Sequence, residues 1–119
     1  MIMSNDLTLG TWPDEPPSPL QLIEQIRQIA KQDDGSIGFS NHAIERLLSR
    51  GYSDRDVLRG FRIGDIKGPI LPGDKSSEWK CEVVFPGTEE RGSRNIGVVT
   101  IVQRGSRLFV KTVMWKDKR

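Results

Sequence analysis

The only histidine of the chain, His42, precedes two arginines at helical spacing, Arg46 and Arg50. On a helix that advances about 100° per residue, Arg46 lies about 40° and Arg50 about 80° round from His42, so the three side chains share one stripe. Histidine titrates close to neutrality and moves protons readily, and a guanidinium group binds phosphate oxygens through paired N–H groups. The spacing therefore predicts a phosphate-binding stripe in which His42 transfers a proton and no metal ion is required.

This stripe lies on a short predicted helix that begins after Ser40 and ends at Gly51. Serine is a favoured N-cap residue, and glycine suits the left-handed conformation that ends a helix. His42 falls in the first turn, where unpaired backbone N–H groups favour an anion. The opposite side of the helix carries three apolar residues that we expect to face the core, namely Ile44, Leu47 and Leu48.

A complete acid–base site needs more than this helix provides. Cleavage of RNA through its 2′-hydroxyl needs a base and an acid, and one histidine supplies only one of them at a time. Glu45, Lys80 and Lys111 are candidates for the second group, and Lys111 is preferred, either as a proton donor or through its charge alone. In the simpler alternative, His42 caps the helix or bonds the sheet, and the arginines form a solvated face.

Two further helices are predicted around this one. A capping-box pattern with proline at the first helical position begins the earlier helix, at Ser18, Pro19 and Gln21. Apolar residues at helical spacing predict that it covers residues 19 to 32. The pair Ser53 and Asp56 repeats the cap pattern, so a third helix is expected from there to Gly64.

From Asp65 onward the sequence pattern is typical of strands. The expected strands cover residues 66 to 71, 78 to 85, 96 to 103 and 107 to 115. Gly68-Pro69 restricts the first of them to a sheet edge or a bulge. The second alternates, with one side expected to face the helices: Trp79, Cys81, Val83 and Phe85. The order predicts an α+β domain, with two to three N-terminal helices on one face of a three- to four-stranded, mainly antiparallel sheet.

Composition and charge bound the class of protein. A chain of 119 residues fits one domain, expected over residues 18 to 119 after a flexible, acidic, proline-rich arm over residues 1 to 17. No membrane span or secretory signal is evident, so a cytoplasmic location is expected. The single Cys81 gives neither an internal disulfide nor a zinc motif, and no cofactor is expected.

The charge is unevenly distributed. Residues 1 to 39 hold two basic and six acidic residues, a net charge of −4, and residues 40 to 119 hold sixteen basic and ten acidic residues, a net charge of +6. A basic body favours an anionic partner such as RNA, although a merely solvated surface has the same composition. A further hypothesis is that the acidic N-terminal part covers the basic face until a partner arrives.

The run F-S-N-H-A-I-E-R-L-L-S-R-G-Y-S-D-R-D-V resembles a motif, H-A-x-x-R-x-x-x-R-G-[hydrophobic]-S-x-x-[DE]-V. The motif is that of a bacterial family catalogued as domain of unknown function 4258. The resemblance covers residues 39 to 64, and K-T-V-M-W in the last strand is similar to the family's ending, so residues 39 to 119 are the family-like part. The resemblance implies a fold like that of RelE-type toxins and small ribonucleases, and a cognate antitoxin-like partner. His42, Arg46 and Arg50 are its motif positions.

The sequence and the resemblance together predict a metal-independent endoribonuclease of bacterial toxin type. Its predicted catalytic residues are His42, Arg46, Arg50 and Lys111. A non-catalytic module that binds RNA or an acidic protein through the same stripe is the main alternative. Less favoured hypotheses are an accessory protein whose apolar first helix docks a partner, and a helix-turn-helix that reads DNA.

Overall fold

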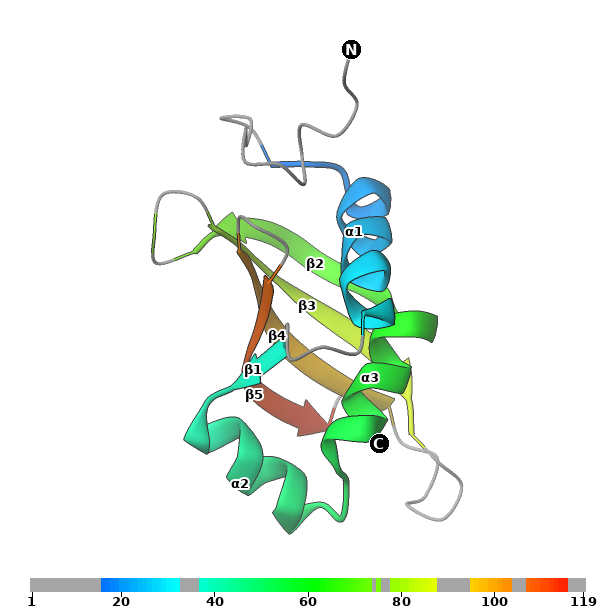
Figure 1. Cartoon of the computed structure of the whole chain (residues 1–119), viewed down its shortest axis with the longest axis vertical. Helices are drawn as coiled ribbons and strands as arrows, with labels where there is room; N and C mark the ends of the chain where they lie inside the picture. Colours follow the sequence, from blue (N-terminus) through cyan, green and yellow to red (C-terminus); the bar gives the residue numbers. More distant parts are fainter. Residues whose placement is uncertain are drawn as a thin grey trace.

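The computed structural model describes residues 16–32, 37–73, 75, 78–87, 95–103 and 107–115. Within these residues it forms helices and strands in the order α1 (Pro19–Lys31), β1 (Ile37–Phe39), α2 (Asn41–Ser49), α3 (Asp54–Ile63), β2 (Asp65–Pro72), β3 (Glu78–Pro86), β4 (Asn95–Gln103) and β5 (Arg107–Trp115) (Figure 1). Residues 1–15 of the predicted arm, and residues 104–106 between the last two predicted strands, lie outside the described residues.

The start of α1 is the one that its sequence predicts. The Ser18 hydroxyl oxygen accepts a hydrogen bond from the backbone N–H of Gln21 at 3.1 Å, and the Gln21 side-chain oxygen accepts one from the N–H of Ser18 at 3.0 Å. The apolar stripe of the helix is buried: Leu22, Ile23, Ile26, Ile29 and Ala30. This stripe belongs to the core, so it does not offer the exposed surface that a partner-docking first helix would need.

The five strands of the described residues form one sheet in the order β1-β5-β4-β3-β2. Strands β2 to β5 pair antiparallel, as expected, but β1 pairs parallel with β5, with Phe39 opposite Val110. The α+β class is therefore confirmed, whereas the prediction of three to four strands missed β1. A three-residue strand is too short to show alternation, and its backbone bonds come from the distant end of the chain.

The strand β2 is both an edge strand and irregular, which confirms the reading of Gly68-Pro69. It lies at the end of the sheet, and its register against β3 shifts between Lys67 and Leu71. Gly68 has a positive φ of 79°, a conformation that a residue with a Cβ rarely adopts.

A bulge interrupts β5 at Lys111. Thr100 pairs with Val110 and Val99 pairs with Thr112, so Lys111 has no residue opposite it in β4. The extra residue shifts the alternation, and Val113 therefore joins Val110 in the core although the two are three residues apart. The side chain of Lys111 lies on the sheet face opposite the core, together with those of Ile101 and Phe109.

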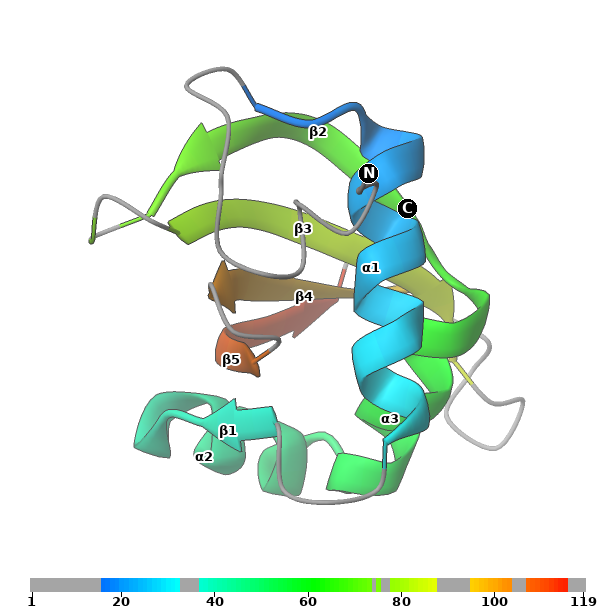
Figure 2. The same ribbon diagram turned by 45° about the horizontal axis from the view of Figure 1, so that its top comes forward.

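The helices do not share one position over the sheet. α1 packs against α3 and α3 against β3, whereas α2 packs against β5. Figure 2 shows α1 in front of β3 and β4, and α2 with β1 beneath β5. All three helices contribute to a single core, but the prediction that they cover one face matches only α1 and α3 closely. No helix in the described part of the chain is long and apolar enough to cross a membrane.

Candidate functional site

The surface of α2 is divided into three stripes, and only the middle one is buried. Ala43 and Leu47 are 0% and 5% exposed and face β5. His42 and Arg46 lie exposed on one side of this line. The other side carries two exposed apolar side chains, Ile44 and Leu48. The expectation that Ile44, Leu47 and Leu48 face the core is therefore confirmed for Leu47 and wrong for Ile44 and Leu48, because the helix lies along the end of the sheet and buries only a narrow line.

The N-terminus of α2 is fixed to β5 beside the bulge. The backbone N–H of Ser40 donates to the carbonyl oxygen of Val110 at 3.0 Å, and the Ser40 hydroxyl donates to the carbonyl oxygen of Lys111 at 2.7 Å. The same hydroxyl oxygen accepts from the N–H of Ala43 at 3.0 Å, which completes the predicted N-cap. The structure thus brings Lys111 next to the first turn of α2, which carries His42.

Arg50 does not share the exposure of His42 and Arg46. It is half-buried at the C-cap of α2, and its guanidinium carbon lies 5.6 Å from the centre of the Trp115 ring. Tyr52 contacts the same ring edge-on, with 5.7 Å between the ring centres. Arg50 lies about 80° round the helix from His42, on the side that faces the sheet. It therefore holds the C-terminal end of α2 against β5.

The three candidates for the second group lie in different places. Lys111 is half-buried and lines a cavity of about 210 Å³ with Lys75, Glu78, Ile101, Gln103 and Phe109. Lys80 lines a separate cavity of about 160 Å³, which also holds Lys67 and Glu82. Glu45 is exposed on α2. Lys111 is therefore the strand lysine that the structure joins to the His42 helix.

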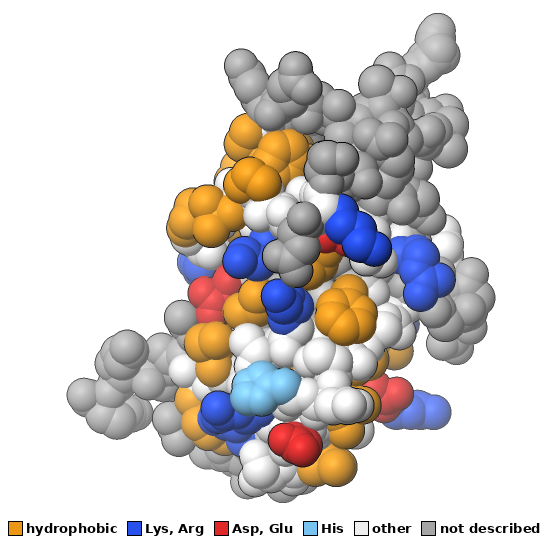
Figure 3. Space-filling model, turned by 90° about the vertical axis from the view of Figure 1, so that its left-hand side faces the viewer, with side chains coloured by type: hydrophobic (Ala, Val, Ile, Leu, Met, Phe, Trp, Pro, Cys, Tyr) orange, Lys and Arg blue, Asp and Glu red, His pale blue; other side chains and the backbone are white. Residues whose placement is uncertain are grey.

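Figure 3 shows the face that carries the histidine. Basic side chains, in blue, lie both above and below the pale blue histidine, and an acidic side chain lies just below it. Further acidic side chains, in red, lie on the same face, so it carries charges of both signs, and the basic side chains next to the histidine are the ones that attract an anionic ligand.

Glu78 is a functional candidate that the sequence did not suggest. Glu78 is 7% exposed. Its carboxylate accepts a hydrogen bond from the Gln103 side-chain N–H at 2.9 Å and one from the backbone N–H of Lys75 at 3.2 Å. The alternation of β3 places Glu78 on the same face as Lys80, which is the only sequence signal for it. Its closeness to Lys111 depends on the pairing of β3, β4 and β5.

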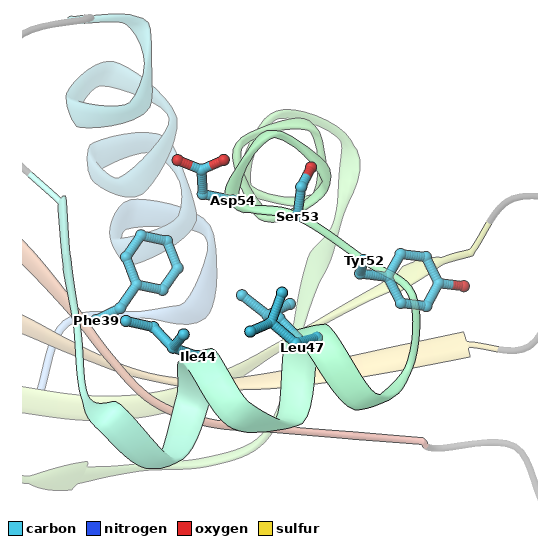
Figure 4. Close-up of a pocket in the computed structure, with 7 residues that line it drawn as sticks. Phe39, Ile44, Leu47, Tyr52, Ser53 and Asp54 are labelled. Carbon is cyan, nitrogen blue, oxygen red and sulfur yellow. The ribbon is translucent and has the colours of Figure 1, made fainter.

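A second surface feature lies on the opposite side of α2 from His42. It is an apolar groove of about 330 Å³, shown in Figure 4, which is lined by Phe39, Ile44, Leu47, Leu48, Tyr52, Ser53 and Asp54. Ser53 begins α3 as predicted, with its backbone N–H donating to the Asp56 carboxylate at 2.8 Å.

Neither the Cys81 thiol nor any cluster of metal ligands forms a further candidate site among the described residues. Burial, and then the charge of Glu82, raise the pKa of the Cys81 thiol from its ordinary value of 9.0 to about 12. A thiol that keeps its proton is a poor nucleophile. Within the described ranges no group of three or more histidine, cysteine or acidic side chains is placed to hold a metal ion.

The chain was compared with protein-family models, with curated proteins and with solved structures, and none of them matches. The resemblance to the bacterial family therefore rests on the motif in residues 39 to 64 and on the similar ending K-T-V-M-W in the last strand.

Proposed function

We propose that the protein is a metal-independent endoribonuclease of bacterial toxin type. The observation that carries the proposal is the bond from Ser40 to the Lys111 carbonyl, which sets a strand lysine beside the helix turn that holds His42. Arg46 lies one turn further along the same exposed side. A histidine, an arginine and a lysine around one anion are the groups that phosphodiester cleavage uses. The motif resemblance supports the same class.

In the proposed reaction the 2′-hydroxyl of RNA attacks the adjacent phosphorus. The His42 imidazole accepts the hydroxyl proton as the new O2′–P bond forms. The P–O5′ bond breaks, and the Lys111 ammonium group donates a proton to the leaving oxygen. Arg46 and Lys111 stabilise the negative charge of the transition state. The products are a 2′,3′-cyclic phosphate and a 5′-hydroxyl, and solvent restores both protonation states.

Arg50 has a different role in this proposal. Its guanidinium group lies over Trp115, so it holds the helix that carries His42 and does not bind the phosphate. Arg50 is therefore a positioning residue, whereas the motif resemblance alone treats it as equivalent to Arg46.

Cleavage of a labelled RNA oligonucleotide by the purified full chain tests the proposal. The buffer contains EDTA, and the ends of the products are identified by mass spectrometry. His42→Ala and Lys111→Ala are each expected to lower the cleavage rate by about 10²- to 10⁴-fold, the range that loss of a general acid or base produces. Arg62→Ala is the matched control, since Arg62 is an exposed basic residue at the end of α3. Absence of cleavage, or equal cleavage by His42→Ala, would contradict the proposal.

A non-catalytic RNA-binding module is the second candidate. The observation in its favour is that His42 and Arg46 are exposed and line none of the three cavities described above. This candidate predicts RNA binding that weakens with salt and with Arg46→Ala, while His42→Ala is nearly silent. Tight binding that persists in high salt would exclude it.

The motif resemblance also leads us to propose an antitoxin-like protein as a partner. Co-expression with the product of an adjoining small gene tests this, and the expected result is a complex that elutes earlier than either protein alone in size-exclusion chromatography. Separate elution of the two proteins would contradict it.

A further inference from the structure

The cavity beside Lys111 combines apolar and hydrogen-bonding walls on the sheet face opposite the core. Its volume is about 210 Å³, and its walls are formed by Ile101, Phe109, Glu78, Gln103, Lys75 and Lys111. Pockets for drug-sized ligands begin at about 300 Å³, so this cavity suits a smaller group. Because the cavity lies next to the proposed phosphate site, a nucleobase is an occupant of suitable size.

The walls of this cavity are set by the strand register. Glu78 lies directly opposite Gln103, and Ile101 lies directly opposite Phe109 in the next row. A Cβ at Gly38, which pairs with Phe109, would lie 3.2 Å from Cδ1 of the phenylalanine ring. Because glycine has no Cβ, the Phe109 ring has space to lie beside the cavity. An aromatic side chain in this position is able to stack on a base.

The buried carboxylate of Glu78 determines which base fits. A carboxylate only accepts hydrogen bonds, and its two oxygens offer about four lone-pair directions. The side chain of Gln103 and the backbone of Lys75 use one direction on each oxygen. Each oxygen therefore retains capacity for a further donor. Guanine presents two adjacent donors on its Watson–Crick edge, N1–H and the 2-amino group, and the other RNA bases do not.

We propose that this cavity is a guanine-binding subsite, an inference that rests on the proposed RNA-cleaving function. Lys111 belongs to both parts of the site: its backbone carbonyl holds Ser40 at the start of α2, and its side chain lines the cavity. The base of one nucleotide enters the cavity against Phe109 and Glu78, and its phosphate lies toward His42 and Lys111. The enzyme then prefers to cleave RNA next to guanine.

Binding of nucleotides to the unaltered full chain provides the first test. Isothermal titration calorimetry with guanosine, inosine and adenosine 3′-monophosphates compares three ligands that share one phosphate. Inosine lacks only the 2-amino group of guanosine. Since a good bidentate contact gives about 1–3 kcal/mol of discrimination, the guanosine nucleotide is expected to bind about 5- to 150-fold more tightly than the adenosine nucleotide. The inosine nucleotide is expected to lie between them. Equal affinities for all three would overturn the proposal.

Variants identify the residue that makes the distinction. Glu78→Gln is expected to remove the preference for guanosine over adenosine while binding of the adenosine nucleotide stays within about twofold. Glu82→Gln is the matched control, because Glu82 lies on the same face of β3 but lines the separate cavity of about 160 Å³ that Lys80 also lines. This variant is expected to keep the preference for guanosine. Loss of the preference in both variants, or in neither, would overturn the assignment to Glu78. Circular dichroism confirms that each variant is folded.

The outcome separates this inference from the proposed function. RNA that is cleaved with no preference for guanine leaves the ribonuclease proposal standing and refutes the guanine subsite. Preferential binding of the guanosine nucleotide without any cleavage of RNA supports the subsite and refutes the ribonuclease proposal.

Discussion

The hydroxyl of Ser40 donates a hydrogen bond of 2.7 Å to the carbonyl oxygen of Lys111, 71 residues further along the chain. The Ser40 hydroxyl oxygen also caps α2 by accepting a hydrogen bond from the N–H of Ala43. Ser40, the residue that follows β1, therefore begins the helix and connects it to the bulge in β5. The proposed phosphate site depends on this connection, because it holds the first turn of α2 beside Lys111.

Replacement of Ser40 by alanine is expected to lower the free energy of unfolding by about 1–2 kcal/mol, since it removes an N-cap and leaves the partly buried carbonyl of Lys111 without this donor. Urea denaturation followed by circular dichroism measures the change. Ser49→Ala is the matched control, because the exposed Ser49 hydroxyl only donates to the Arg46 carbonyl within the same helix. An equal loss in both variants would show that the bond to β5 contributes nothing.

Arg50 and Arg46 are expected to respond differently to substitution. Arg50→Ala removes the contact with Trp115 and is expected to cost about 1 kcal/mol of stability. Arg46→Ala, at an exposed position, is expected to change stability by less than about 0.5 kcal/mol while it weakens RNA binding. Denaturation curves and filter binding measure the two effects. Reversal of this pattern would mean that Arg50, and not Arg46, faces the ligand.

Gly60 is required in the middle of α3 by its contact with Phe85. A Cβ on Gly60 would overlap the Phe85 ring, with its Cε1 atom closer than atoms approach in proteins. Helix propensity alone predicts that Gly60→Ala stabilises by roughly 0.5–1 kcal/mol. We expect the opposite sign, a loss of about 1–3 kcal/mol from overpacking.

Chemical denaturation decides the sign for Gly60→Ala. In a double variant with Phe85→Leu, the alanine is expected to cost less than it does alone, because the smaller side chain leaves space for it. A stabilising effect of Gly60→Ala in the otherwise unchanged protein would show that the two elements move apart at little cost.

The raised pKa of Cys81 predicts a loss of stability in alkali. The folded protein keeps the thiol proton up to about pH 12, whereas the unfolded chain loses it near the ordinary value of 9.0. The thiol's contribution is thus complete below pH 9 and declines as the pH rises from about 9 toward 12. The difference in unfolding free energy between the unaltered protein and Cys81→Ala should therefore shrink across this range.

The Cys81→Ala variant retains every other group that titrates in alkali, so its difference from the unaltered protein reports on the thiol alone. Urea denaturation at about pH 8 and about pH 10.5 measures the difference, and a value that is the same at both would contradict the prediction. The native protein is also expected to resist a thiol reagent at about pH 8 and to react after unfolding, because only the thiolate is the nucleophile.

Local patterns predicted the elements that depend on local contacts. The capping box at Ser18 and the apolar stripe that follows it fix α1, and the alternation from Trp79 to Phe85 fixes the buried side of β3. Each of these signals lies within one turn of a helix or between next-nearest residues of a strand. For the same reason the sequence located His42 and Arg46 on one exposed side of α2.

The tertiary structure alone decided which residues meet. It turned Arg50 toward Trp115, left Ile44 and Leu48 exposed, added the short parallel strand β1, and brought Glu78 into one cavity with Lys111. These outcomes depend on the register of strands and on where α2 lies along β5. Their partners are far apart in the sequence, so no local pattern encodes them. The sequence by itself determined the helix that carries the histidine, and the pairing of β1 with β5 determined that Lys111 lies beside it.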